Sequence, residues 1–172
     1  MLTTGEAGQR RRRQRVPAEE RRRQLVEVGA RVFALKGYSE AGTADIARAC
    51  GIAEPTIYRH FSGKEEFFLT VARAAVEQLA RGLKETAPHD LGALEAFLRR
   101  EAEESPHLAL LGRLLAEARW SPFREEAEGA LGRLEEALSS LGESVSLGRA
   151  FTAGVALLAA GGLLVPAERW AA

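Results

Sequence analysis

The sequence predicts an all-α protein with a small N-terminal three-helix module and a larger helical domain after it. Apolar residues recur every three or four positions along most of the 172 residues, and no strand-like alternation interrupts this pattern. Residues 1–64 carry 13 Lys and Arg against 7 Asp and Glu, whereas residues 65–172 carry 11 against 17. A basic part joined to an acidic part indicates a nucleic-acid-binding module attached to a module of another kind.

The composition favours a globular intracellular protein. The 46% hydrophobic and 28% charged content is typical of a folded chain, and a single cysteine excludes an internal disulfide framework. No apolar segment follows the polar and basic start, so we expect no signal peptide. The longest uncharged run, residues 150–167, contains two adjacent glycines and a proline and is short for a membrane span. We therefore expect no membrane partner.

Residues 1–16 form a basic arm that we expect to be disordered, because five arginines at 10–15 have no apolar neighbours to anchor them. The arm either follows DNA phosphates or a minor groove, or only adds nonspecific affinity.

Residues 17–66 form the predicted DNA-binding domain. Its first helix begins at Pro17, ends at Gly37 and leaves Tyr38 to pack the corner. The expected buried stripe of this helix comprises Leu25, Val28, Val32, Phe33 and Leu35.

The stretch from Thr43 to Phe61, TADIARACGIAEPTIYRHF, matches a helix-turn-helix. Ala47 is small enough for a second helix to cross above it, and Gly51 permits the left-handed backbone that ends the first helix. The apolar residues that would set the angle between the two helices are Ile46, Cys50, Ile52 and Ile57. We predict a helix over 43–50, capped by Thr43, and a recognition helix over 54–60. The alternative is an ordinary helical hairpin.

The same stretch and its continuation resemble the TetR/AcrR family of transcriptional regulators. The matching residues are Thr43, Ala47, Gly51, Ile52, Thr56, Ile57, Tyr58, His60, Phe61, Lys64, Glu65 and Phe67. The resemblance implies an all-α fold of about nine helices or slightly fewer and a cytoplasmic, prokaryotic homodimer. It also implies a repressor that binds a palindromic operator in double-stranded DNA and is released by a small-molecule effector. The sequence departs from the family pattern at two positions, Ala53 and Pro55. Ala53 cannot cap a helix with its side chain, whereas Pro55 suits a first helical turn.

Eight residues are candidates for DNA contact: Thr43, Glu54, Pro55, Thr56, Tyr58, Arg59, His60 and Lys64. Thr56 and Arg59 are the candidates for base contacts, because Arg can fork onto guanine O6 and N7. Glu54 either accepts a hydrogen bond from a cytosine amine or holds Arg59 in place. The resemblance implies that the remaining residues contact the DNA backbone, which positions the protein without selecting sequence.

A long helix is expected to follow, opened by a capping box of Ser62 and Glu65. Its apolar stripe, which runs from Phe67 to Leu83, is long enough to serve a core in each domain, so a tilt of this helix is the expected coupling between them. The stripe comprises Phe67, Phe68, Val71, Ala72, Ala75, Val76, Leu79 and Leu83. Further helices are expected over about 90–104, 107–119, 122–141 and 146–165.

Residues 67–172 would form an effector-binding and dimerisation domain. The resemblance implies an apolar or acyl-type small-molecule effector, and the candidate lining residues are Phe97, His107, Leu111, Arg113, Leu114, Leu115, Arg119, Trp120 and Phe123. A fully packed core explains each of these residues equally well. The resemblance also implies a dimer formed by the last two helices, with candidate contacts at Ala127, Leu131, Leu134, Leu138, Phe151, Gly154, Leu158, Gly161 and Val165. The alternative for this stripe is packing within one chain.

The sequence contains no constellation typical of an enzyme. Glu104 and His107 have the spacing of a di-iron helical motif, but Pro106 would break the helix that presents them and the motif occurs once. We therefore predict no catalytic residues, no metal site and no cofactor. Among DNA-binding proteins, the alternative to a ligand-released repressor is a ligand-independent, nucleoid-associated factor whose C-terminal domain docks other proteins.

Overall fold

A computed structural model describes residues 17–88, 90–118 and 122–139. Within these ranges helices are the only regular secondary structure, which confirms the predicted all-α class for this part of the protein. The elements are α1 (Ala18–Glu40), α2 (Thr43–Ala49), the 3₁₀ helix η1 (Glu54–Arg59), α3 (Lys64–Thr86), α4 (Leu91–Glu104), α5 (His107–Glu117) and α6 (Phe123–Ser139). The basic arm and the helix expected over 146–165 lie outside the described residues.

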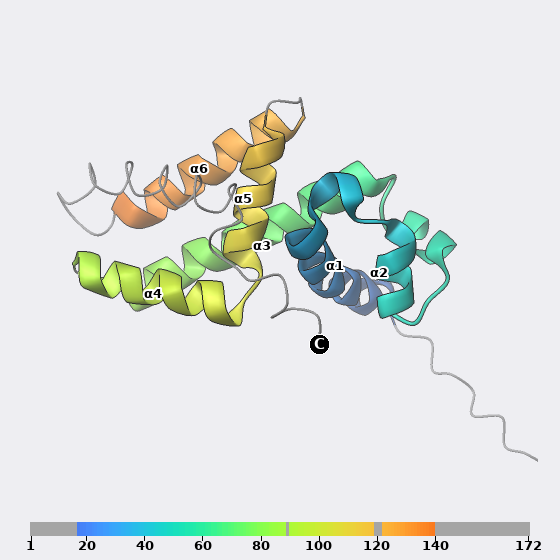
Figure 1. The fold of residues 1–172 in the computed structure, drawn as a ribbon, viewed down its shortest axis with the longest axis horizontal. Helices are drawn as coiled ribbons and strands as arrows, with labels where there is room; N and C mark the ends of the chain where they lie inside the picture. Colours follow the sequence, from blue (N-terminus) through green and yellow to red (C-terminus); the bar gives the residue numbers. More distant parts are fainter. Residues whose placement is uncertain (1–16, 89, 119–121, 140–172) are drawn as a thin grey trace, which may run out of the picture.

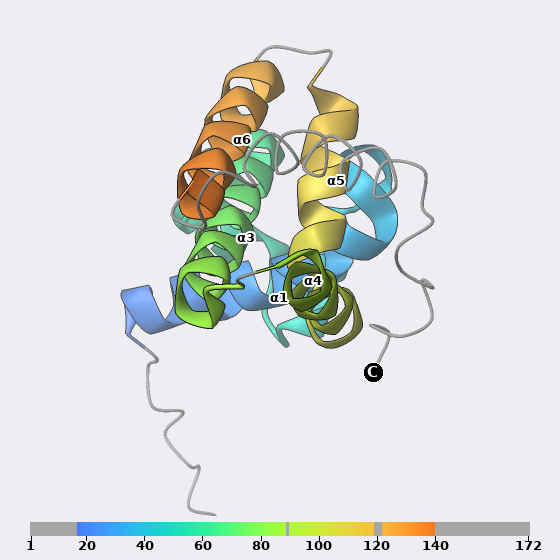
Figure 2. The ribbon, with the colours of Figure 1, turned by 90° about the vertical axis from the view of Figure 1, so that its left-hand side faces the viewer.

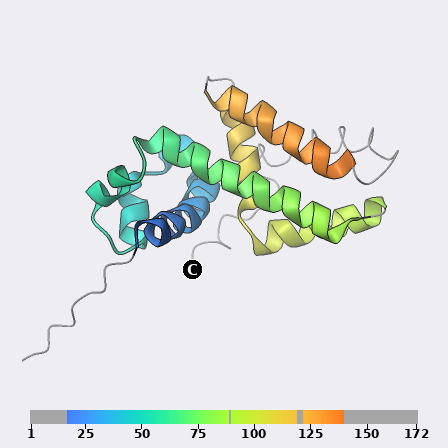
Figure 3. The same ribbon diagram turned by 180° about the vertical axis from the view of Figure 1, so that it is seen from behind.

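The long helix α3 organises the arrangement of the others. It runs from the small helices α2 and η1 at one end of the molecule to α4 and α6 at the other (Figures 1 and 3). Helix α5 stands across the middle, where it packs against α1, α4 and α6 as well as α3 (Figures 1 and 2). No described helix is both long and apolar enough to cross a membrane.

Helix α1 leaves the helical conformation at Gly37, as the sequence predicts, and then continues for one further turn. Gly37 has φ 71° and ψ −178°, a conformation that favours glycine, and the turn after it reaches Glu40. Tyr38 packs the corner that follows. Its ring centroid lies 5.3 Å from that of Phe68 and 4.8 Å from that of Phe123. The end of α1 is therefore held against both α3 and α6.

The segment from Thr43 to Phe61 contains α2 and η1, each one residue shorter than predicted, and η1 is a 3₁₀ helix. Gly51 has φ 64°, the left-handed backbone expected after the first helix, while Ile46, Ala47 and Ile57 are buried. The cap of α2 is different from our prediction, because Gly42 stands at that position and Thr43 lies inside the first turn. The thiol of Cys50 is partly buried, and this burial raises its pKa.

The start of α3 differs from the predicted capping box of Ser62 and Glu65, because the N-cap and the glutamate that accepts a hydrogen bond each lie one residue later. The N-cap is Gly63, which has no side chain and so provides no capping hydrogen bond. Instead, the carboxylate of Glu66 accepts a hydrogen bond from the backbone N–H of Ser62 at 2.6 Å, and hydrogen bonds from Ser62 hold the pKa of Glu66 below its ordinary value. The apolar stripe of this helix is confirmed, since all eight predicted residues are buried.

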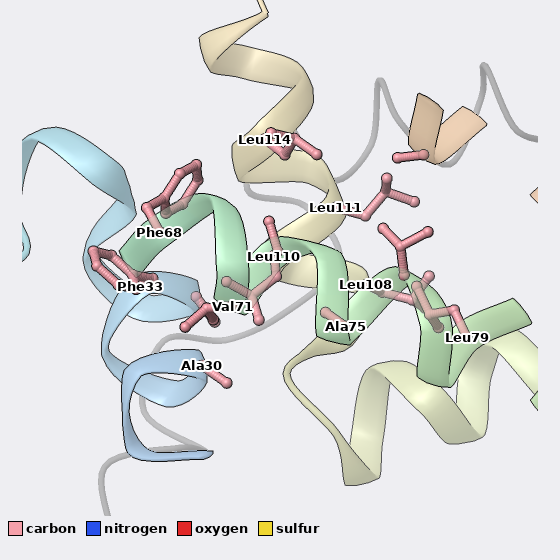
Figure 4. Packing of buried hydrophobic residues seen from close by; sticks show 14 of the residues in the cluster. Ala30, Phe33, Phe68, Val71, Ala75, Leu79, Leu108, Leu110, Leu111 and Leu114 are labelled. Carbon is pink, nitrogen blue, oxygen red and sulfur yellow. The ribbon is translucent and has the colours of Figure 1, made fainter. Parts of the chain in front are cut away.

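The buried residues form one continuous cluster from η1 to α6 rather than two separate cores. Figure 4 shows its middle part, where Phe33 of α1 lies beside Phe68 of α3, and α5 contributes the leucines that face the rest of α3. The rings of Phe33 and Phe68 meet edge to face at 5.1 Å, and those of Phe61 and Phe67 stack at 4.3 Å. Aromatic pairs of this kind add about 1 kcal/mol to the burial of their area.

Candidate nucleic-acid interface

The segment expected to read DNA is the 3₁₀ helix η1, which lies next to α2. Ile57 anchors it in the core, whereas Tyr58 is 50% exposed and is the one large hydrophobic residue with that much exposure among those the structure describes. The segment lacks a side-chain cap at Ala53, as expected, and Pro55 lies in its first turn. With Ile57 as the buried anchor, Pro55, Tyr58 and Arg59 of this short helix are exposed to solvent.

Arg59 and Thr56, the two candidates for base contact, are at least partly exposed to solvent. Arg59 is exposed, and it forms no hydrogen bond or ion pair with any residue that the structure describes. Thr56 is half-buried, and its backbone N–H donates to the carbonyl of Ala53 at 2.9 Å. His60 ends the segment by donating its backbone N–H to Ile57. A free guanidinium on a short, open helix is suited to forked hydrogen bonds with a base edge.

Three side chains at the edge of this surface are bound to one another. Thr43, which is only 8% exposed, donates its hydroxyl hydrogen to a carboxylate oxygen of Glu54, and its Oγ1 lies 3.0 Å from the hydroxyl oxygen of Tyr58. Glu54 is thus paired with Thr43 rather than with Arg59. Neither partner was found by sequence reasoning, because the three residues are 11 and 15 positions apart and follow no known pattern.

Charged residues beside the segment are also engaged within the chain. The ammonium of Lys64, a predicted phosphate contact, donates to the carbonyl of Ser39 at 3.1 Å and lies 4.8 Å from the ring centroid of Tyr38. Lys36 and Arg48 both bind the carboxylate of Asp45, at 2.6 and 2.9 Å. The hydrogen bond from Lys36, followed by that from Arg48, lowers the pKa of Asp45. The spacing of Asp45 and Arg48 signals this second pair in the sequence.

Comparison with known proteins identifies this part of the chain. Residues 25–71 match the family model described as "Bacterial regulatory proteins, tetR family". These residues form a tetR-family domain. The HTH-type transcriptional activator FasR of Mycolicibacterium smegmatis is 40% identical over 79 residues, which are 46% of this chain and 36% of FasR. The HTH-type transcriptional regulator TtgR of Pseudomonas putida is 34% identical over 85 residues, which are 49% of this chain and 37% of TtgR.

The matched regions therefore span less than half the length of these curated relatives. Two solved structures share the fold over more of the chain. The regulatory protein TetR from Rhodobacter sphaeroides aligns with a TM-score of 0.65 and 24% identity, over 84% of this chain and 90% of that one. A TetR-like transcriptional regulator from Rhodococcus sp. RHA1 aligns with a TM-score of 0.63 and 22% identity, over 91% and 92%.

Beyond the tetR-family domain, most candidate effector contacts that the structure describes are part of the packed core. Phe97, Leu111, Leu114 and Phe123 are all buried in the hydrophobic cluster. The ring of Phe97 lies so close to Gly82 that a Cβ at Gly82 would come within 2.9 Å of it. Leu115 is partly buried against the same cluster. Arg119 and Trp120 lie outside the described residues.

Arg113, a candidate effector contact, binds another part of the chain. Its guanidinium reaches from α5 to the end of α1 in the tetR-family domain, where Nε donates to the carbonyl of Ala34 at 3.3 Å and Nη2 to that of Leu35 at 3.0 Å. The same side chain lies over Gly37. Cations are favourable at a helix C-terminus, where carbonyl groups carry partial negative charge. Arg113 therefore binds α1 instead of facing an open pocket.

His107 belongs to a small polar cluster at the start of α5. Its Nδ1 lies 3.0 Å from Oγ of Ser105 and 3.3 Å from a carboxylate oxygen of Glu101. The hydrogen bond with His107 lowers the pKa of Glu101. Because both partners meet the same ring nitrogen, the cluster cannot relay a proton from Ser105 through the ring to Glu101. No group of three or more potential metal ligands gathers anywhere in the described part of the chain.

The structure describes four of the candidate dimer contacts, all on α6. Ala127, Leu134 and Leu138 are buried within the single chain, where α6 packs against α3 and α5, so they do not form a free surface. The alternative of packing within one chain holds for these three residues. Leu131 is half-buried. The remaining candidates, Phe151, Gly154, Leu158, Gly161 and Val165, lie outside the described residues.

Proposed function

We propose that this protein is a DNA-binding transcriptional regulator that acts as a homodimeric repressor. It would bind a palindromic operator through η1 and release the operator when a small-molecule effector binds the C-terminal domain. The observation that carries this proposal is the exposed Arg59 on the short helix η1 of a tetR-family domain, whose guanidinium pairs with no other residue that the structure describes. The family match and the basic N-terminal part support the same reading.

Recognition would divide between bases and phosphates. Arg59 would donate two hydrogen bonds to guanine O6 and N7, and Thr56 would contact a neighbouring base edge. Pro55, Tyr58 and His60 would contact the DNA backbone. In a dimer, two copies of η1 would reach successive major-groove faces about 34 Å apart, or somewhat more, on a site with two-fold symmetry.

An effector would release DNA only by binding one arrangement of the helices more tightly than the other. The contacts of α1 with both α3 and α5 support two routes between the domains, whereas the sequence predicts one route through the long helix alone. A shift of α5 would act on α1 through Arg113, whose guanidinium binds the carbonyls of Ala34 and Leu35. A tilt of α3 would act on the rest of the tetR-family domain.

The proposal is tested by selecting bound sequences from a random pool of duplex DNA with the purified full chain. We expect a palindromic consensus and an affinity that falls steeply as the salt concentration rises from about 50 to 200 mM. A consensus without two-fold symmetry would contradict a symmetric dimer on DNA. Affinity that hardly responds to salt would contradict the electrostatic part of the proposal.

A ligand-independent DNA-binding factor is the second candidate function. It is favoured by the buried positions of Phe97, Leu111, Leu114 and Phe123, which fill the core of the second domain. Titration of the operator complex with a panel of apolar and acyl-type compounds separates the two. Release of DNA by one compound class supports the repressor. Binding of none of them, together with capture of a protein partner by the DNA-bound full chain, supports the alternative.

A further inference from the structure

The hydrogen bonds among Thr43, Glu54 and Tyr58 have a defined direction. A threonine hydroxyl has one hydrogen to donate, and Thr43 donates it to the carboxylate of Glu54. The contact of 3.0 Å between Thr43 and Tyr58 must therefore use the hydrogen of the tyrosine hydroxyl. The donors run from Tyr58 to Thr43 and from Thr43 to Glu54, so both hydroxyl hydrogens point into the protein.

This direction matters because the oxygens of a DNA phosphate only accept hydrogen bonds. In the structure, neither Thr43 nor Tyr58 has a hydroxyl hydrogen left to give to a phosphate. Thr43 is also 8% exposed. Glu54 thus holds the hydroxyl hydrogen of Thr43, and Thr43 in turn holds that of Tyr58, so neither side chain can donate to the DNA backbone.

We propose that Glu54 is a specificity-determining residue that withholds Thr43 and Tyr58 until an amino group of a base takes over its carboxylate. The inference rests on the proposed DNA-binding function. Glu54 is the first residue of η1 and precedes the exposed Pro55 at the end expected to enter the groove. In the major groove, the donors available to a carboxylate are N4 of cytosine and N6 of adenine.

The consequence is that one base contact controls one backbone contact. On a site that presents an amino group to Glu54, the carboxylate turns to the base. Thr43 can then donate its hydrogen to the hydroxyl oxygen of Tyr58, and the hydroxyl hydrogen of the exposed Tyr58 becomes free for a phosphate. On other DNA the carboxylate keeps Thr43, and its negative charge faces the phosphates. Discrimination at this base pair then exceeds what a single hydrogen bond to a base provides.

The test compares two duplexes of equal length, one with the selected operator and one of random sequence, with the purified full chain by fluorescence anisotropy. We expect Glu54→Ala to raise the affinity for the random duplex by about tenfold, because a repelling charge is removed and the hydroxyl hydrogen of Tyr58 becomes free. Affinity for the operator should rise less or fall, so the ratio of the two affinities decreases. In a Tyr58→Phe background, the gain on the random duplex should shrink to below about threefold.

The matched control is Glu65→Ala, which removes an exposed carboxylate from the first turn of α3, within the same domain. It should change the affinity for random DNA by less than about threefold. Glu54→Gln provides a second variant that keeps an acceptor oxygen without the charge, and we expect an intermediate gain. Thermal melting by circular dichroism verifies that each variant is folded.

Three results would overturn the role of Glu54. Equal loss of affinity for both duplexes in a folded Glu54→Ala variant would make the residue purely structural. An equal gain from Glu65→Ala would reduce the effect to net charge, and a gain that persists in the Tyr58→Phe background would exclude the hydroxyl contacts. If the unmodified chain selects no sequence from the random pool, the proposed function itself fails, and the inference fails with it.

Discussion

Replacement of Arg113 by Met tests the contact between α5 and the end of α1. Methionine keeps an unbranched side chain over Gly37 but loses the two hydrogen bonds to the carbonyls of Ala34 and Leu35. A hydrogen bond from a charged donor contributes about 1.5 kcal/mol or more, and we take the lower value because Arg113 is only partly buried. The free energy of unfolding should therefore fall by about 2–3 kcal/mol, which lowers Tm by about 5–10 °C in a domain of this size.

Urea denaturation followed by circular dichroism measures this change. The control is Arg99→Met, which removes an exposed arginine that pairs with Glu95 one turn earlier in α4. That pair lies on the surface, so its loss should cost less than about 0.5 kcal/mol. If Arg113→Met and Arg99→Met change the free energy of unfolding by the same small amount, the guanidinium does not hold α1 and α5 together.

Three further predictions concern packing, pH and DNA sequence. Gly29→Ala should lower the free energy of unfolding by about 1–3 kcal/mol, measured by urea denaturation, because its Cβ would lie 2.8 Å from the ring of Phe67. The pKa of Glu101 is lowered by His107, so its contribution to stability is present above the ordinary pKa of 4.5 and is lost as the pH falls through the folded-state pKa. Glu101→Gln should flatten the decrease in unfolding free energy on acidification below pH 4.5, and an unchanged decrease would exclude this carboxylate as its source. Arg59→Ala should relax the consensus obtained by selection at one base pair, with a loss of about 1–3 kcal/mol of discrimination there, whereas an unaltered consensus would exclude a base contact.

Local features of the fold could be predicted from the sequence because they depend on the backbone and on helical periodicity. The buried face of α3 follows from the spacing of its apolar residues, whatever lies opposite. The left-handed conformations at Gly37 and Gly51 follow from the cost of a side chain there. The capping box was wrong by one residue because Glu65 and Glu66 both fit, and the sequence does not show that Gly63 becomes the N-cap.

Partners that are distant in the chain could not be predicted in the same way. Arg113 and Ala34 are 79 residues apart, and an arginine on a mostly apolar helix fits an anion site as well as a helix end. The stripe on α6 shows that Leu134 and Leu138 are buried but not what covers them. Sequence supplies the chemistry of a side chain, whereas its partner depends on how helices far apart in the chain come together.

The continuous core limits where this chain can be joined to part of another protein to make a chimera. The predicted boundary after residue 66 falls between Phe61 and Phe67, whose rings stack at 4.3 Å, and Phe33 of α1 meets Phe67 and Phe68 beyond it. A chimera joined at this point would place a foreign helix against aromatic surfaces shaped for α3. Exchange of DNA specificity between such proteins should therefore succeed by grafting the few exposed residues of η1, while the helices beneath them stay together.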